Sequence, residues 1–271
     1  MTKKIIIVSI LILIIAVTGV MLWNRLHINQ KEGQKELVLY CGAGIRTGAA
    51  AVIDAFAVKN NVRIIPTYEG SGQSLGKISA GAGGDLFMPG AELYVEKAIE
   101  KGLAGGETKK TVAYFIPVLF IQKGNPKSIL TLQDLKKNGI RVGIGDERSA
   151  AVGKTTMDIL KKNGIAYDDV AKNVVYKSGT ADELGVAIQM RTVDVVVIWD
   201  VNARYFSQHG EIIQIPPDQN IPSLIPIVIL KSTRYPQEAK EFVDFATSSE
   251  GKKIMTDHGF TISYPEEKAG N

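Results

Sequence analysis

Strand-like and helix-like segments alternate along most of this chain, and this order constrains its fold more than any other feature. A β-rich run at residues 37–40 precedes a helix-like segment at 47–59, and a second β-rich run follows at 62–68. The alternation continues to the apolar run that ends at Trp199, and helix-like segments at 236–247 and 249–258 close the chain. Strands that alternate with helices predict an α/β fold with parallel sheets flanked by helices.

Two apolar runs that each contain a proline predict that the chain crosses twice between two lobes. They are AYFIPV at residues 113–118 and PSLIPI at residues 222–227. Proline is tolerated at a sheet edge or at the first position of a strand, but not inside a central strand. With both runs as hinge strands, residues 36–115 plus 226–271 form lobe one, and residues 116–225 form lobe two.

The first 35 residues predict an export signal or a membrane anchor with a short tail. Lys3 and Lys4 precede a largely apolar stretch of 19 residues, from 5 to 23. This length is close to the roughly 20 residues that a spanning helix needs, and no A-x-A cleavage pattern stands out near its end. These features favour an uncleaved anchor over a cleaved signal, and they place the rest of the chain outside the cytoplasm.

Charge and cysteine content exclude several classes of protein. The formal net charge is +4, but in residues 1–34 four lysines and arginines against Glu32 account for +3. The nearly neutral remainder lacks the basic stripe of a nucleic-acid-binding protein. A single cysteine, Cys41, excludes an internal disulfide and any multi-cysteine metal centre.

Four loops place small or polar residues immediately before a predicted helix. They are GAGIR at 42–46, GSG at 70–72, SAAVG at 149–153 and SGTAD at 178–182. The free N–H groups at a helix N-terminus bind anions without a cationic side chain. In open α/β sheets such loops meet at one edge, where ligands bind. The loops therefore predict a shared anion site, although each could also serve only to cap its helix.

Several of these segments resemble molybdate-binding proteins of ABC importers. In lobe one the resemblance lies in LYCGAG, YEGSGQSL, ISAGAGGDLF and EKAIEKGL, at residues 39–44, 68–75, 78–87 and 96–103. Near the C-terminus it lies in IPIVILK, AKEFVDFA, SEG and HGF, at residues 225–231, 239–246, 249–251 and 258–260. That second group is shared by many extracellular solute-binding proteins. The resemblance implies a two-lobed periplasmic-binding-protein fold of type II that closes on its ligand about two hinge strands.

The resemblance also implies a set of ligand contacts. The family's second-loop serine falls on Ser71, and its backbone donors fall on Val152 and, within one residue, on Asp182. Two positions depart from the family pattern, because a first-loop serine is replaced by Gly44 and a tyrosine by Trp199. The indole N–H of Trp199 remains a donor. Arg46, close to Gly44, either provides a charged fork for an oxyanion or lies on the surface.

The implied function is that of the solute-binding subunit of an ABC importer, which captures a tetrahedral oxyanion, molybdate or tungstate first, and delivers it to a membrane permease. We expect a monomer at the outer face of the cytoplasmic membrane or in the periplasm, with no catalytic residues, no cofactor and no metal ligands. A membrane-tethered sensor for a sulfate-like or phosphorylated anion is an alternative.

A weaker alternative is a dinucleotide-binding enzyme. The spacing Gly42-x-Gly44-x-x-x-Gly48, followed by Glu69 at the end of the next strand, approximates a dinucleotide fingerprint. The spacing between its last two glycines is one residue too long. The three histidines also form no recognisable nucleophile or metal pattern, so a hydrolase is disfavoured.

Overall fold

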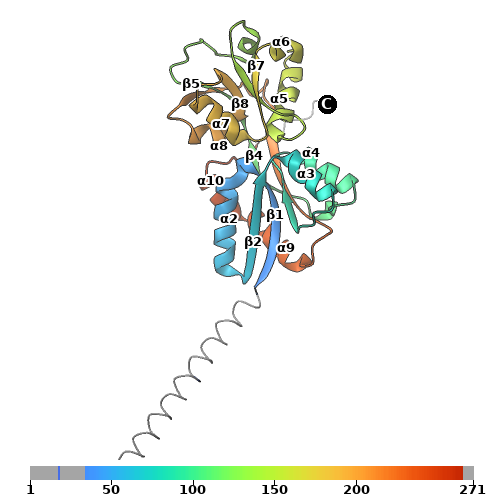
Figure 1. The fold of residues 1–271 in the computed structure, drawn as a ribbon. Coiled ribbons are helices and arrows are strands. Elements are labelled where there is room, and N and C mark those ends of the chain that lie inside the picture. Colours follow the sequence, from blue (N-terminus) through green and yellow to red (C-terminus); the bar gives the residue numbers. More distant parts are fainter. Residues whose placement is uncertain (1–17, 19–33, 265–271) are drawn as a thin grey trace, which may run out of the picture.

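The computed structural model describes Thr18 and residues 34–264. Apart from Thr18, the predicted membrane segment at 5–23 lies outside the described residues, as do residues 24–33 of its tail. Within the part of the chain that is described, no helix combines the length and the apolar character that crossing a bilayer requires. The described residues form two α/β lobes that meet at a narrow waist (Figure 1).

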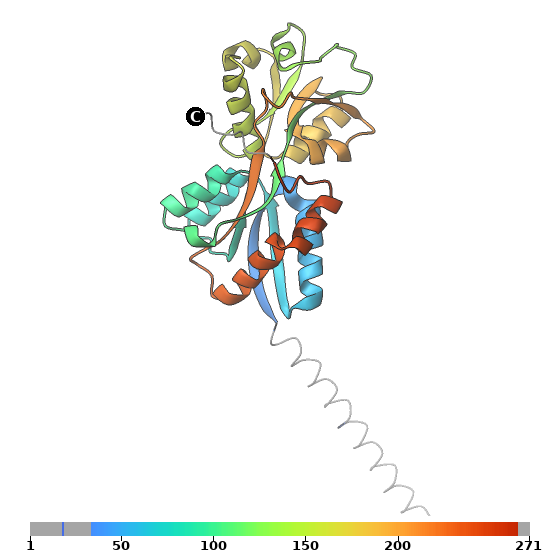
Figure 2. The same cartoon turned by 180° about the vertical axis from the view of Figure 1, so that it is seen from behind.

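Lobe one is built on a five-stranded sheet with the strand order β2-β1-β3-β10-β4. Its strands are β1 (Lys35–Gly42), β2 (Val62–Glu69), β3 (Leu86–Met88), β4 (Lys110–Phe115) and β10 (Ser223–Ile229). Its helices are α2 (Arg46–Lys59), α3 (Ser71–Ser79), α4 (Glu92–Glu100), α9 (Pro236–Thr247) and α10 (Ser249–Asp257), with short 3-10 turns η1 (Ala43–Ile45) and η2 (Gly106–Thr108). The last two helices lie beside α2 on one side of the sheet (Figure 2).

Lobe two repeats this plan with the strand order β7-β6-β8-β5-β9. Its strands are β5 (Pro117–Gln122), β6 (Val142–Gly145), β7 (Val174–Ser178), β8 (Val195–Trp199) and β9 (Gly210–Gln214). Its helices are α5 (Ala151–Lys162), α6 (Tyr167–Ala171), α7 (Ala181–Gln189) and α8 (Asp200–Tyr205), with the 3-10 turn η3 (Leu132–Lys136).

The α/β fold is as predicted, but the sheets are mixed, so the parallel arrangement expected from the sequence applies to only part of each sheet. The strands β1, β2 and β3 run parallel to one another, as do β6, β7 and β8. By contrast, β10 is antiparallel to both β3 and β4, and β5 is antiparallel to both β8 and β9. The reversed strands, β5 and β10, are those by which the chain enters each lobe from the other.

The chain crosses between the lobes at two places. Only Ile116 separates β4 in lobe one from β5 in lobe two, and the return leads from β9 to β10. All of β10 lies in the sheet of lobe one, so the division expected between residues 225 and 226 falls inside this strand. Two of the three prolines in the predicted hinge runs lie within strands, Pro117 at the first position of β5 and Pro226 at a register shift of β10, while Pro222 immediately precedes β10.

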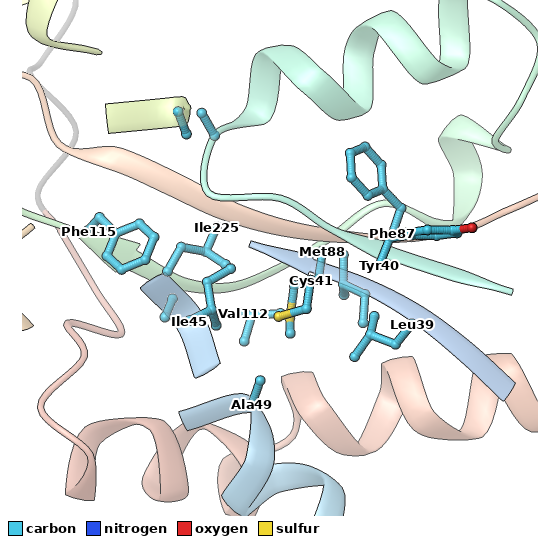
Figure 3. Close-up of a cluster of buried hydrophobic side chains, with 14 of the residues drawn as sticks. Leu39, Tyr40, Cys41, Ile45, Ala49, Phe87, Met88, Val112, Phe115 and Ile225 are labelled. Atoms are coloured by element: carbon cyan, nitrogen blue, oxygen red, sulfur yellow. The ribbon is translucent and has the colours of Figure 1, made fainter. Parts of the chain in front are cut away.

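Burial of the C-terminal half of β1 fixes the loop that follows it. Leu39 and Cys41 are fully buried between the sheet and its helices, in a cluster with Ile45, Met88 and Val112 (Figure 3). Burial raises the pKa of the Cys41 thiol, which keeps it in the neutral form. The glycine-rich turn η1 is therefore held by apolar packing at both ends.

In lobe two, an ion pair between the buried Asp194 and the half-exposed Arg141 anchors the start of β8. Asp194, immediately before β8, accepts hydrogen bonds from the backbone N, Nε and Nη2 of Arg141 at 2.8, 3.2 and 2.7 Å. Burial raises the pKa of Asp194, but the hydrogen bonds and charge of Arg141 outweigh it, and the pKa lies below its ordinary value.

We expect Asp194→Asn to lower the free energy of unfolding by about 1–3 kcal/mol at pH 7, because the buried carboxylate that accepts three hydrogen bonds from Arg141 is replaced by a neutral amide with one acceptor oxygen. A depressed folded-state pKa gives stability that is present above the unfolded pKa of about 3.9 and is lost as the pH falls through the folded-state value. The free energies of unfolding of the wild type and Asp194→Asn, measured with urea at pH 7 and pH 3, should therefore differ less at pH 3. The control Asp158→Asn removes an exposed pair with Lys154 and should change stability by less than about 0.5 kcal/mol. Equal losses for Asp194→Asn at both pH values would contradict this account.

Candidate functional site

A small hollow lies between the two lobes near the waist. The volume open to the centre of a water-sized sphere is about 20 Å³. A sphere of that volume, enlarged by the ~1.4 Å radius of water, has a radius of roughly 3 Å. The lining residues are Gly42, Ala43, Gly44, Glu69, Gly70, Ser71, Gly90, Phe115, Ala150, Ala151, Val152, Gly179, Thr180, Ala181 and Trp199. They include members of all four loops that the sequence singled out.

Three helix N-termini converge on this hollow from the two lobes. Ser71 is the first residue of α3 in lobe one, while Ala151 and Ala181 are the first residues of α5 and α7 in lobe two. The first N–H groups of a helix have no partner within the helix, and the helix dipole adds a partial positive charge there. Both lobes thus direct N–H donors towards the same small space.

The hydroxyl of Ser71 is oriented as a further donor. Its Oγ accepts a hydrogen bond of 3.0 Å from the backbone N–H of Gly90, which follows β3. The side chain is 3% exposed and lines the hollow. Because a hydroxyl carries one proton, the bond from Gly90 leaves that proton available for a second partner in the hollow.

Trp199 forms one wall of the hollow from the end of β8. Its indole stacks on Phe115 of lobe one, with ring centroids 4.6 Å apart and an interplanar angle of 4°. The side chain is 2% exposed, and no residue within 34–264 accepts a hydrogen bond from its indole N–H. Because Trp199 lines the hollow, its indole N–H can donate to a ligand there.

The backbones of the two lobes approach each other at the loop before α3. The N–H of Gly72 donates to the carbonyl oxygen of Ser149 in lobe two, at 2.9 Å. A Cβ atom on Gly72 would lie 1.9 Å from the carbonyl oxygen of Arg148, and one on Gly70 would lie 2.5 Å from that of Ser149. These two glycines are therefore required by the contact between lobes.

The loop of lobe two that meets Gly72 is held by Asp146. This carboxylate accepts hydrogen bonds from the backbone N–H groups of Arg148 and Ser149, at 2.9 and 3.1 Å. Burial raises the pKa of Asp146, but these hydrogen bonds outweigh it and hold the pKa below its usual value. The carbonyl of Ser149 is thus presented to lobe one by a fixed turn.

The hollow has almost no net charge of its own. Among the described residues that line it, Glu69 is the only charged one. Its Oε1 accepts a hydrogen bond of 3.0 Å from Ser74, and its Oε2 is paired with Lys77. Because it is paired with Lys77, Glu69 adds no unpaired negative charge to the hollow.

The structure brings four of the six predicted site residues together and leaves two outside. Gly44, Ser71, Val152 and Trp199 line the hollow, and the two positions that depart from the family pattern, Gly44 and Trp199, are in contact. Arg46 is exposed, with its guanidinium 4.3 Å from the ring centroid of Tyr68.

Asp182 lies behind the hollow, one residue beyond Ala181. It accepts a hydrogen bond of 2.8 Å from Nδ2 of Asn202, which also donates to the carbonyl of Gly44 at 3.3 Å. Burial raises the pKa of Asp182, partly offset by Asn202 and Arg46. Asn202 therefore links the lobes. The sequence analysis missed this residue, because it lies on α8, a helix that was not predicted.

The glycines of the approximate dinucleotide fingerprint have other uses in the structure. A Cβ atom on Gly48 would lie 2.7 Å from Sδ of Met255, so this glycine lets α2 pack against α10. In the described part of the chain, no group of three or more His, Cys, Asp or Glu side chains is placed to hold a metal ion.

Comparison with known proteins gives a consistent assignment of family. Residues 37–261 match the family of bacterial extracellular solute-binding proteins. A binding protein of Haemophilus influenzae is 28% identical over 83% of this chain and 90% of its own. The molybdate-binding protein of Mycobacterium tuberculosis is 22% identical, over 84% of this chain and 85% of its own.

Solved structures share the fold at low sequence identity. The periplasmic binding protein AfuA from Actinobacillus pleuropneumoniae, with fructose-6-phosphate bound, superposes with a TM-score of 0.76 at 20% identity, covering 85% of each chain. The matched proteins are binding proteins and not enzymes, in agreement with the expectation from the sequence.

Proposed function

The chain belongs to the family of bacterial extracellular solute-binding proteins, and we propose that it captures a tetrahedral oxyanion between its lobes for an ABC importer. The observation that carries this proposal is that helix N-termini from both lobes converge on one hollow, whose lining contains no cationic side chain among the described residues. Such donors stabilise an anion by hydrogen bonds and dipoles, without burying a second full charge.

The size of the hollow supports a compact anion. A radius of roughly 3 Å accommodates one central atom and its shell of oxygens, and leaves no room for a large organic group. Molybdate and tungstate are the preferred candidates, since a molybdate-binding relative aligns over most of the chain. Sulfate and phosphorylated ligands follow in that order.

We infer that binding proceeds by closure of lobe two over an anion held first by lobe one. Ser71 and the loop at Gly44 offer the first donors, and the N–H groups of Val152 and Ala181 with the indole of Trp199 complete the cage. The interlobe bond from Gly72 to Ser149 then holds the closed state. A protonated ligand would carry its own donor into a cage of donors, so the fully deprotonated anion binds best.

The cellular location and the membrane partner of the protein also belong to the proposal. Residues 1–35 would tether or export the chain, and a permease would receive the anion. A membrane-tethered sensor would use the same closure to report the anion to a receptor.

The direct test is isothermal titration calorimetry of the full-length protein with molybdate, tungstate, sulfate, phosphate and a phosphate monoester, with NAD as a control. We expect saturable binding of molybdate and tungstate. Binding of none of the five anions would overturn the proposal, and binding of NAD would revive the enzyme alternative.

Ser71→Ala should weaken anion binding by about 1–3 kcal/mol, because a hydrogen bond to a charged ligand is lost. Ser79→Ala, at the exposed end of the same helix, is the matched control and should bind as the wild type does. Unchanged affinity in Ser71→Ala would remove this hydroxyl from the site.

Gly72→Ala should reduce anion affinity by at least about 100-fold, since the added Cβ atom keeps the carbonyl of Arg148 from its place in the closed state. Gly76→Ala adds a Cβ atom on the same helix in open space and should leave affinity unchanged. Affinity of the Gly72→Ala protein within a few-fold of the wild type would show that the interlobe contact is not part of the bound state.

A further inference from the structure

Gly44 lacks a side chain for a reason that lies in the opposite lobe. Its backbone is not among the described glycines with positive φ, so the local chain conformation does not demand glycine. A Cβ atom at this position would instead lie 3.0 Å from Oδ1 of Asn202 and 3.2 Å from Cδ1 of Trp199, both in lobe two. It would also lie 3.3 Å from Cζ of Phe115.

None of these neighbours can easily move away. Trp199 is stacked flat on Phe115, and Phe115 in turn contacts Phe260 with ring centroids 5.7 Å apart. Asn202 is 2% exposed and is held by its hydrogen bonds to Gly44 and Asp182. Its Oδ1 has no hydrogen-bond partner among the described residues, so a closer apolar neighbour would add to an existing cost.

The two positions also face the same ligand space. Gly44 and Trp199 both line the hollow, one from each lobe, and the indole is the largest side chain in its wall. A shift of the indole by a few tenths of an ångström changes a hollow of about 20 Å³ appreciably.

We propose that Gly44 and Trp199 act as one specificity determinant, in which the indole closes over lobe one in the space that a side chain at position 44 would take. The pair sets how closely the cage fits its anion, so the effects of changes at the two positions are coupled. This inference rests on the proposed capture of an oxyanion in the hollow.

The test is a double-mutant cycle on the full-length protein, with affinities for molybdate and for sulfate measured by calorimetry. The proteins are the wild type, Gly44→Ala, Trp199→Val and the double variant. Valine keeps the β-branched character of β8 and removes Cδ1. Gly76→Ala controls for the general effect of replacing a glycine.

We expect Gly44→Ala to bind molybdate about 10-fold more weakly than the wild type, and Trp199→Val at least about 100-fold more weakly. The double variant should bind more tightly than additive losses would give, because Trp199→Val removes the 3.2 Å contact between Cδ1 and the added methyl group, although the contacts of that methyl with Asn202 and Phe115 remain. The ratio of the affinities for molybdate and sulfate should become smaller in Trp199→Val and stay unchanged in Gly76→Ala.

If the losses of binding free energy are additive in the double variant, or if Gly44→Ala binds as tightly as the wild type, the proposed coupling of Gly44 and Trp199 is wrong. If Trp199→Val does not fold, as judged by circular dichroism, Trp199→Leu replaces it with the same expectation, since the leucine methyl groups can rotate away. Failure of the wild type to bind either anion would instead count against the proposed function, so the two failures are distinguishable.

Discussion

The close approach of two backbones across the waist is the constraint on which the rest of this structure depends. At Gly70 and Gly72 the loop before α3 lies so near lobe two that a single methyl group would collide with its carbonyl oxygens. That approach brings the N-termini of α5 and α7 to within the span of a small anion from Ser71. Without it, each lobe would have only an exposed helix end, where water competes for the same N–H groups.

In the proposed capture of an anion, the donors that the hollow offers carry no formal charge. Its lining offers backbone N–H groups, the Ser71 hydroxyl and the Trp199 indole, while the one carboxylate, Glu69, is engaged by Ser74 and Lys77. In a desolvated site, such dipoles act strongly and need little reorganisation when the ligand arrives. Arg46, which the sequence analysis named as a possible charged ligand of the anion, stacks on Tyr68 instead. Burial raises the pKa of that tyrosine to about 12.

The sequence predicted more of the architecture than of the contacts. The long, strongly periodic helices were found, and α9 has the predicted bounds. The short elements α6, α8 and β9 were missed, because five or six residues give too little periodicity to detect. The direction of β5 and β10 was also missed, since it depends on where the chain crosses between lobes, which is a tertiary property.

At the site, the loops could be predicted because glycine and serine before a helix have a local meaning. Pairings across the waist could not, because Gly44 and Trp199 are 155 positions apart in the chain and meet only when the lobes close. The second loop was expected to form part of an anion site or to cap its helix, whereas the structure also uses its glycines to admit the backbone of lobe two.

The measurement that tests the central claim most directly is a ¹H–¹⁵N NMR titration of the protein with molybdate. If neutral donors at the helix N-termini hold the anion, the amide signals of Ser71, Val152 and Ala181 and the indole signal of Trp199 should shift downfield together at one equivalent. Saturable binding that leaves these four signals in place would show that the anion is held elsewhere and would contradict the account.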